Sequence, residues 1–483
     1  MKKLFLLISA ILVFVNARSQ EIWTLEKCIS YALTNNIQVK QQNLQVDLGK
    51  SNVLQNKLTM LPTLNGFASH GYNYGKTVDR FTNTFATERV QSNNFYLSSS
   101  VTLFDGFQKI NQLKMSQSEL QATNYDTDKF MDDISLNIAT AYLQILYYKE
   151  LVKTTENQLQ ATELQSQRLK KLVDAGALAQ GDYFNLEAQK AIENSAAVDA
   201  RNNYDLSILT LTQLLDLPTS AGFTIESPDL ELGEQPQLLI RPEQVFDYAL
   251  QAQPSIKSAE SRVKSSEYGL SIAQGGQSPT VTLQGSLGTG YSGAAQILDS
   301  YIPYVPDVTQ TAPVGFIPGP DGQPLQYVWN YGADVTYKTK PFGDQINDNI
   351  NKSFSFNLTV PIFNGWATRT SISKARINLE NSRYNLDQSK LQLRKTIEQA
   401  YADSKAALNK YESSKLGVAA AKESYRYSEQ KFNVGMINSV DYNNSKKDLE
   451  KAESELLRAK FEFIFKTTVL DFYMGKPISL KRK

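Results

Sequence analysis

The 483-residue sequence predicts an α+β membrane protein that combines long α-helical hairpins with transmembrane β-strands. Three observations lead to this fold class: an export signal at the start of the chain, one structural unit written twice, and a switch from helical to alternating hydrophobic periodicity inside each unit. The expected architecture is an α-helical coiled-coil barrel continued by a transmembrane β-barrel, with four strands supplied by each copy of the chain.

Residues 1–19 have the three parts of a secretory signal peptide. Two lysines precede the apolar run Leu4–Val15, and Ala17 and Ser19 place small side chains where a signal peptidase cleaves. The twelve residues of the run are too few for a transmembrane helix, which needs about 20 residues. The mature chain is therefore expected to begin near Gln20.

Composition argues against several kinds of site. The 50 Lys and Arg residues balance 49 Asp and Glu residues, so no overall field selects nucleic acid. A single cysteine and a single histidine cannot form an internal disulfide or a Cys/His metal site, and we expect Cys28 to be packed and His70 to lie in a strand. The sequence shows no nucleophile with its base and no phosphate-binding loop, so we expect neither an enzyme nor a cofactor.

The two halves of the chain share motifs at constant spacing. Phe104-Asp105-Gly106-Phe107 recurs as Phe363-Asn364-Gly365-Trp366, 259 residues later. The same offset relates Ala141-Tyr142 to Ala400-Tyr401, Gly176 to Gly435, Asp182-Tyr183 to Asp441-Tyr442, and Pro218 to Pro477. Upstream the offset falls to 217, as between Pro62 and Pro279, which indicates a 42-residue insertion between Pro279 and Phe363.

This duplication predicts two repeats, each made of a helix, a β-hairpin and a long α-hairpin. A polar, proline-containing linker joins them, and the insertion makes a long loop, 290–350, in the second β-hairpin. In chain order the parts are the first repeat (20–217, with its β-hairpin at 62–106), the linker (218–241) and the second repeat (242–483, with its β-hairpin at 279–365).

The long segments of both repeats lack helix breakers. The segment Lys109–Asp174 contains no proline and is rich in good helix formers. As one continuous helix, it would reach about 100 Å. Gly176 and Gly435 can each take the left-handed conformation that ends a helix, so an α-hairpin with its tip near each glycine is expected. Small residues on a seam let helices pack closely, and the charged faces are expected to lie in solvent.

In both β-hairpins apolar residues alternate with polar ones. The apolar residues are Phe95, Leu97, Val101 and Leu103 in the first hairpin and Val281, Leu283, Leu287, Phe354, Phe356, Leu358, Val360 and Ile362 in the second. A soluble two-sided sheet has the same pattern, but the export signal favours membrane strands. Four strands cannot close a barrel, and lipid tolerates no open sheet edge. Three copies would pool twelve strands, an even number within the range of outer-membrane barrels.

With these parts in this order, the chain resembles the TolC family of outer-membrane efflux proteins over essentially the whole mature sequence. The resemblance rests on the two Phe-x-Gly corners and on the tip Phe432-Asn433-Val434-Gly435 followed by Ser439-Val440-Asp441. It implies a homotrimer in the outer membrane of a Gram-negative bacterium, with the helical part in the periplasm. The function implied is that of a passive exit duct of a tripartite efflux or type I secretion system. The implied partners are a periplasmic membrane-fusion adaptor, an inner-membrane pump of the RND or ABC type and outer-membrane lipid.

The resemblance also implies roles for particular residues. The tips, with Gly176, Asp182 and Gly435, would form the periplasmic mouth and meet the adaptor. Phe104, Gly106, Phe363 and Gly365 would form the corners between barrel and helices.

Similar proteins restrict the mouth with acidic side chains, and the matching position is Asp441, three copies of which would ring the axis. The second acidic position is Asn444 and the expected basic partner is Ile437, which puts the family's ionic lock in doubt. Asp441 reads equally well as a surface carboxylate or a helix cap.

Two alternatives remain open at this point. A secreted structural coiled-coil protein would share the export signal and the long helices but would need no lipid-facing strands. The loop 290–350 is expected to face the outside, where it either narrows the exit or is only a surface loop.

Overall fold

The structure is a computed structural model that describes residues 22–86, 89–176, 179–228, 240–304, 313–329 and 332–479. The expected signal peptide, 1–19, lies outside the described residues, as does 229–239 of the expected linker. The chain divides into two compact units. We call them the helical unit (1–53, 114–268 and 374–483) and the strand unit (54–113 and 269–373). Each unit draws on both halves of the chain, so the units differ from the predicted repeats.

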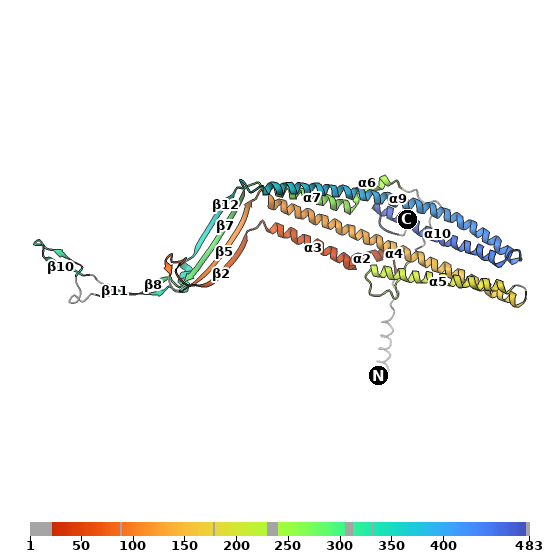
Figure 1. Cartoon of the computed structure of the whole chain (residues 1–483), viewed down its shortest axis with the longest axis horizontal. Coiled ribbons are helices and arrows are strands. Elements are labelled where there is room, and N and C mark those ends of the chain that lie inside the picture. The colour runs from red at the N-terminus through yellow and green to blue at the C-terminus, as the bar shows by residue number, and fades with distance from the viewer. Residues whose placement is uncertain are drawn as a thin grey trace, which may run out of the picture. The chain divides into compact units, whose positions relative to one another are not determined.

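Long helices make up most of the helical unit. In chain order the helices are α2 (Leu25–Asn35), α3 (Ile37–Leu58), α4 (Gln108–Asp174), α5 (Gln180–Leu214), α6 (Pro242–Ala252), α7 (Pro254–Gly275), α9 (Ala367–Asn433) and α10 (Ser439–Tyr473). Helices α4 and α5 form one long hairpin, and α9 and α10 form another (Figure 1). The prediction of one uninterrupted helix over Lys109–Asp174 is confirmed by α4. None of the described helices combines the length and the hydrophobicity that a membrane-spanning helix needs.

The segment before each β-hairpin contains two helices, where the sequence predicted one. Between α2 and α3 the side chain of Asn36 accepts a hydrogen bond from the Gln38 amide (2.9 Å) and donates one to the Leu214 carbonyl (3.1 Å). It therefore caps α3 and ties that helix to the end of α5. In the second half Pro254 begins α7 directly after Gln253, because a proline fits the first turn of a helix but not its interior.

The main hydrophobic core of the helical unit surrounds Tyr142 of α4, which is 1 % exposed. Its hydroxyl lies 2.7 Å from the Glu226 carbonyl oxygen and 3.1 Å from the Trp23 carbonyl oxygen. These contacts fix β1 (Ile22–Trp23), which pairs in parallel with β6 (Thr224–Ile225). Cys28 is buried in the same core, and burial raises the pKa of its thiol to about 12. The prediction of a packed cysteine is confirmed.

The strand unit is built on one four-stranded antiparallel sheet with the order β12-β7-β5-β2. The strands are β2 (Thr63–Asn73), β5 (Val90–Phe104), β7 (Thr280–Ser292) and β12 (Asn351–Thr359). Strand β5 pairs with β2 on one side and with β7 on the other, so the two predicted hairpins join into a single sheet. His70 lies in β2, as expected, with its Nδ1 2.5 Å from Oδ1 of Asn93.

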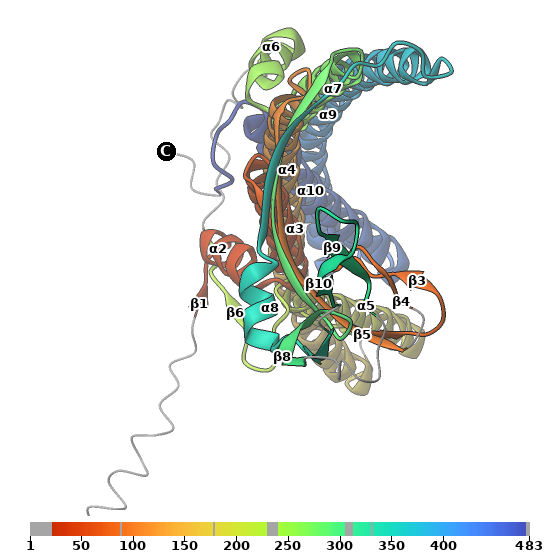
Figure 2. The ribbon, with the colours of Figure 1, turned by 90° about the vertical axis from the view of Figure 1, so that its left-hand side faces the viewer.

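Much of the predicted long loop, 290–350, is regular structure in its described part. Its elements are β8 (Gln296–Tyr304) paired with β11 (Gly332–Thr339), β9 (Gly315–Pro318) paired with β10 (Pro324–Val328), and the short helix α8 (Phe342–Asp348). A smaller pair, β3 (Thr77–Val78) and β4 (Phe85–Ala86), follows β2. Figure 2 shows α8 and the β3–β4 pair on opposite sides of the curved strands of the sheet.

A buried polar network fixes this end of the sheet. Ser292, at the end of β7, donates a 2.6 Å hydrogen bond to Asp79, and its backbone N–H donates to Oε1 of Gln345 in α8 (2.9 Å). Burial would raise the pKa of Asp79, but hydrogen bonds from Ser292, Thr82 and the Phe81 amide outweigh it and lower that pKa. All three members of the network are buried, so the turn after β3 and helix α8 are held to the same strand.

Candidate functional site: sheet faces, corners and hairpin tips

The register of the sheet separates most apolar from most polar side chains; the exceptions include Lys352 on the apolar face and Phe67 and Tyr96 on the polar face. The face that we call the apolar face carries Leu64, Leu97, Val101, Leu283, Leu287, Phe354, Phe356 and Leu358, which neighbour one another across the four strands. The opposite, polar face carries residues such as Asn65, Ser98, Ser100, Ser286, Ser353 and Ser355. Phe354 and Phe356 are 79 % and 65 % exposed, so the single chain leaves the apolar face uncovered. A contiguous exposed apolar surface marks contact with a partner or a membrane.

The predicted corners lie where strands give way to long helices. Gly106 and Phe107 precede α4 with φ of 68° and 63°, and Gly365 and Trp366 precede α9 with φ of 61° and 69°. At Gly106 a side chain is excluded by both its conformation and its surroundings, because an added Cβ would lie 2.6 Å from Cβ of Ser278. Phe104 closes β5, and Phe363 lies between β12 and α9. The structure therefore places all four corner residues at strand-to-helix junctions.

The two α-hairpins turn at the predicted glycines. Gly176 follows α4 with φ of 75°, and its N–H donates to the Val173 carbonyl at 2.9 Å. Gly435 follows α9 with φ of 74°, and the next N–H, of Met436, donates to the Lys431 carbonyl at 2.8 Å. Such bonds satisfy the last carbonyls of a helix and need a left-handed residue, which glycine provides at low cost.

The three predicted gate residues lie around the start of α10. Asn438 is the N-cap of this helix, and its side chain accepts a 2.8 Å hydrogen bond from the Asp441 amide. Asp441 is therefore not the cap but an exposed carboxylate in the first turn, where the helix dipole favours a negative charge. Asn444 is exposed one turn further along the same helix, and Ile437 is half-buried before the cap.

Contacts between the two α-hairpins are made by Ser439 and Tyr442, which lie close to the predicted gate residue Asp441 in the first turn of α10. The Ser439 hydroxyl donates to Oδ1 of Asp182 at 2.5 Å, which joins the first turns of α10 and α5. The Tyr442 hydroxyl donates to Oε1 of Gln165 in α4 at 3.0 Å. Asp182, predicted as a surface contact for an adaptor, thus has a partner within its own chain.

A buried ion pair below the tips was missed by sequence reasoning. Lys446 of α10 lies 2.9 Å from Glu193 of α5, with 8 % and 5 % of their side chains exposed. Lys446 and Glu193 also both bond the hydroxyl of Thr162 in α4. The expectation that the charged faces of these helices lie in solvent is wrong at this point. Each charge finds a partner from another helix, which offsets the cost of its burial.

Glu450 adds a second carboxylate to this cluster. Its Oε1 lies 3.3 Å from Nζ of Lys446 but has no hydrogen-bond partner. Burial raises the pKa of Glu450, as does the negative charge of Glu193, while Lys446 opposes the shift. No sequence signal identifies the cluster, because Lys446 and Glu450 look like other charged residues of a long helix. Within the described ranges, no group of three or more His, Cys, Asp or Glu side chains could hold a metal ion.

Comparison with known proteins identifies the family. The sequence matches the outer membrane efflux protein family over residues 28–216 and 245–463, which is most of the chain. It is 22 % identical over 439 residues to outer membrane protein TolC of Escherichia coli, covering 90 % of this chain and 78 % of TolC. It is 20 % identical over 457 residues to alkaline protease secretion protein AprF of Pseudomonas aeruginosa, covering 92 % of this chain and 82 % of AprF.

The fold is shared with solved outer-membrane channels. The structure of outer membrane protein VceC from Vibrio cholerae superposes with a TM-score of 0.71 at 15 % identity, covering 94 % of this chain and 96 % of that protein. CusC, described as forming a transmembrane channel, superposes with a TM-score of 0.73 at 15 % identity and covers 94 % and 92 % of the two chains. By its sequence match over both halves, this chain belongs to the outer membrane efflux protein family.

Proposed function

We propose that three copies of this chain form one channel in the outer membrane, an exit duct for efflux or secretion. The observation that carries this proposal is the four-stranded sheet with one apolar face and two open edges. Among the described strands, β2 and β12 each pair on one side only. Unpaired backbone groups are costly in lipid, so these edges need partners from other copies.

The direction of the strands supports closure into a ring. Neighbouring strands in the order β12-β7-β5-β2 are all antiparallel, so β2 and β12 run in opposite directions. If β12 of one copy pairs with β2 of the next, the ladder stays antiparallel around the whole ring. Three copies would supply twelve strands, an even number within the observed range of about 8 to 26. The polar face would then line the lumen and the apolar face would contact lipid.

The lengths of the helices support an internal duplication. Helices α2 and α6 each have 11 residues, and α3 and α7 each have 22. Helices α4 and α9 each have 67 residues, and α5 and α10 each have 35. Two matching sets from each of three copies would make a quasi-sixfold wall of helices, a tunnel that extends the barrel into the periplasm.

The hairpin tips would form the periplasmic mouth of this tunnel and meet its partners. We assign the exposed residues near Gly176 and Gly435 to contact with a periplasmic adaptor, which would connect the duct to an inner-membrane pump of the RND or ABC type. The relative AprF is named for the secretion of a protease. The cargo would be set by the pump, and the duct itself would carry out no catalysis.

The proposed ring of three copies is tested by the mass of the particle in detergent and by cross-linking between copies. In a Cys28→Ser background, Asn65→Cys on β2 and Ser355→Cys on β12 place thiols on the polar face of the two edge strands. Further variants move the cysteine on β12 by two residues at a time, to find the position that pairs with Asn65→Cys of the next copy. We expect disulfide-linked dimers and trimers, and a particle of three copies in detergent. The matched control pairs thiols at Ser98 and Ser286, on interior strands, and should give no cross-link between copies. A stable monomer in water without detergent would contradict the proposal.

We further assign Asp441 to the restriction of the periplasmic mouth. Three exposed carboxylates around one axis would hold cations and repel anions. Reversal potentials across planar bilayers under a KCl gradient test this role. We expect Asp441→Asn to lower the preference for cations and Asp387→Asn, an exposed carboxylate on α9, to leave it unchanged. Equal shifts for both variants would remove Asp441 from the gate.

A further inference from the structure

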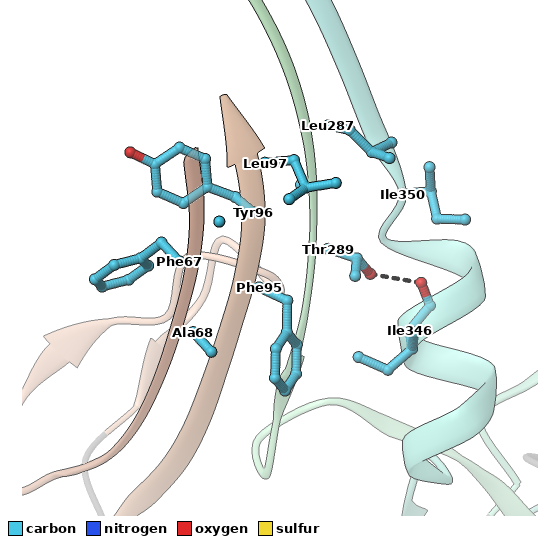
Figure 3. A pocket seen from close by; sticks show the side chains of 11 residues that line it. Phe67, Ala68, Phe95, Tyr96, Leu97, Leu287, Thr289, Ile346 and Ile350 are labelled. Carbon is cyan, nitrogen blue, oxygen red and sulfur yellow. Dashed lines mark hydrogen bonds between the residues drawn. The ribbon is translucent and has the colours of Figure 1, made fainter. Parts of the chain in front are cut away.

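Helix α8 and the apolar face of the sheet enclose a groove of about 480 Å³. Its floor includes Ala68 of β2, Leu97 of β5 and Leu287 of β7, and its wall includes Ile346 and Ile350 from the α8 segment. Figure 3 shows Ile346 and Ile350 on one side, Phe95 and Leu97 on the other, and Leu287 at the end near Ile350.

The groove is held open by polar contacts of α8. The Thr289 hydroxyl donates to the Ile346 carbonyl at 2.5 Å, as the dashed line in Figure 3 shows, and the Asn349 amide donates to the Gly290 carbonyl at 2.8 Å. Gln345, 1 % exposed, bonds both the N–H and the carbonyl of Ser292. These bonds fix α8 on β7 at the rim, so the helix cannot simply move down to fill the space between its isoleucines and the sheet.

The lining selects an apolar ligand. No charged side chain is among the described residues that line the groove, and the Thr289 hydroxyl already donates to α8. Ile350 and Leu97 remain 48 % and 45 % exposed although each has a wall opposite it. A volume of this size lies within the range of about 300 to 1,000 Å³ that is typical of ligand pockets. Filling it with hydrocarbon would remove this apolar surface from water without leaving a polar group unpaired.

We propose that the groove binds one acyl chain of an outer-membrane lipid between α8 and the barrel wall. This inference rests on the proposed function, in which the apolar face contacts lipid. The groove continues that face, because Leu97 and Leu287 are cross-strand neighbours in the same row. Beside it Phe342 contacts both Phe95 and Tyr291, with ring centroids 6.4 and 5.5 Å apart. Aromatic side chains of this kind gather where a barrel meets the membrane–water interface.

A second copy of the chain is a poorer occupant. Most of the groove runs over β5 and β7, which are interior strands already paired on both sides, and only one end of it reaches the edge strand β2, at Gly66–Ala68. In the proposed ring, neighbouring copies would meet at β2 and β12, whereas lipid would reach the whole apolar face.

Photolabelling in vesicles tests the site. The full chain is reconstituted in vesicles of phosphatidylethanolamine and phosphatidylglycerol that contain a phospholipid with a diazirine at the end of one acyl chain. After irradiation, labelled positions are mapped by mass spectrometry.

We expect labelling at Ile346 and Ile350 above the level at Phe356, which lies on the open apolar face. Ala68→Phe, which fills the groove, should abolish this excess and leave the labelling of Phe356 unchanged. The matched control Leu64→Phe, on the same strand and face but outside the groove, should change neither.

The outcomes separate this inference from the proposed function. Labelling of Phe356 without excess at Ile346 and Ile350, or excess that persists in Ala68→Phe, would overturn the acyl-chain site and leave the channel intact. Absence of label from Phe356 as well would overturn the lipid-facing assignment itself. If Ala68→Phe fails to assemble, Ile350→Gln places an amide in the groove from a half-exposed position. It should reduce labelling of Ile346 to the level at Phe356.

Discussion

The Ser439 hydroxyl lies 2.5 Å from Oδ1 of Asp182, and this hydrogen bond links the first turn of α10 to the first turn of α5. Ser439 is 3 % exposed, so water competes poorly for the bond. Because each residue begins the returning helix of its own α-hairpin, the contact holds the two tips together at the ends proposed to form the periplasmic mouth.

Removing this link should loosen the tips. A hydrogen bond to a charged group contributes about 1.5 to 3 kcal/mol. Ser439→Ala is therefore expected to speed amide hydrogen exchange around Gly435 and to raise the conductance of the reconstituted channel. Ser413→Ala, at an exposed serine of α9, is the matched control. If both variants exchange and conduct like the unmodified protein, the contact does not restrain the tips.

Breaking the buried pair of Lys446 and Glu193 should destabilise the helical unit more than breaking any exposed pair. Lys446→Met leaves Glu193 buried without its cation, and breaking a buried pair in this way costs about 3 to 5 kcal/mol. Thermal unfolding followed by circular dichroism in detergent should show a clear drop in melting temperature.

The double variant Lys446→Met with Glu193→Leu is the control for this prediction. It removes both charges of the closest pair, so it should recover much of the lost stability, less the part that Glu450 loses with its cation. The single variant Glu193→Leu completes the comparison. If the double variant loses as much stability as the two single variants together, the two side chains are not coupled.

The sequence predicted the elements better than the contacts between them. Alternation of apolar and polar residues predicted which side chains share a sheet face, because a strand repeats every two residues and a slip would expose the wrong set. The register of Phe356 with Leu283, and of Leu97 with Leu287, follows that pattern. The glycines at the tips were predictable because few other residues accept a positive φ at low cost.

Contacts between distant segments were beyond the sequence. The burial of Lys446 depends on Glu193, which is 253 residues away in the chain, and nothing near either residue marks it. Helix α8 was missed because the insertion that contains it has no counterpart in the first half of the chain. The β-strands of the insertion were missed for the same reason.

The stability of the helical unit should fall as pH rises through the range in which Asp132 loses its proton. Burial raises the pKa of Asp132 from 3.8 to about 6, and the neighbouring carboxylates of Asp128 and Asp133 add to the shift. The folded state thus holds its proton more tightly than the unfolded state does. This difference adds to the free energy of unfolding in full below the pKa of the unfolded state. The added stability is lost as pH rises through the pKa of the folded state.

Asp132→Asn removes this titration. It should raise the melting temperature near pH 7 and change it little below about pH 3, where the carboxyl is mostly neutral in both states. Asp387→Asn, at an exposed position, should leave the pH profile unchanged. An equal effect of Asp132→Asn at both pH values would show that its charge is not responsible.

Neighbouring residues of β12 should respond in opposite ways to the same substitution. Phe356 lies on the apolar face and Ser355 on the polar face, and both are exposed in the single chain. An arginine facing lipid near the bilayer midplane costs about 2 to 4 kcal/mol. Phe356→Arg should therefore reduce the amount of assembled oligomer extracted from outer membranes.

Ser355→Arg should assemble normally and lower the conductance, because its guanidinium would lie in the water-filled lumen. Phe356→Leu, which keeps the side chain apolar, should behave like the unmodified protein. The reverse pattern would place water on the Phe356 side of the sheet, and the assignment of the two faces would then be wrong.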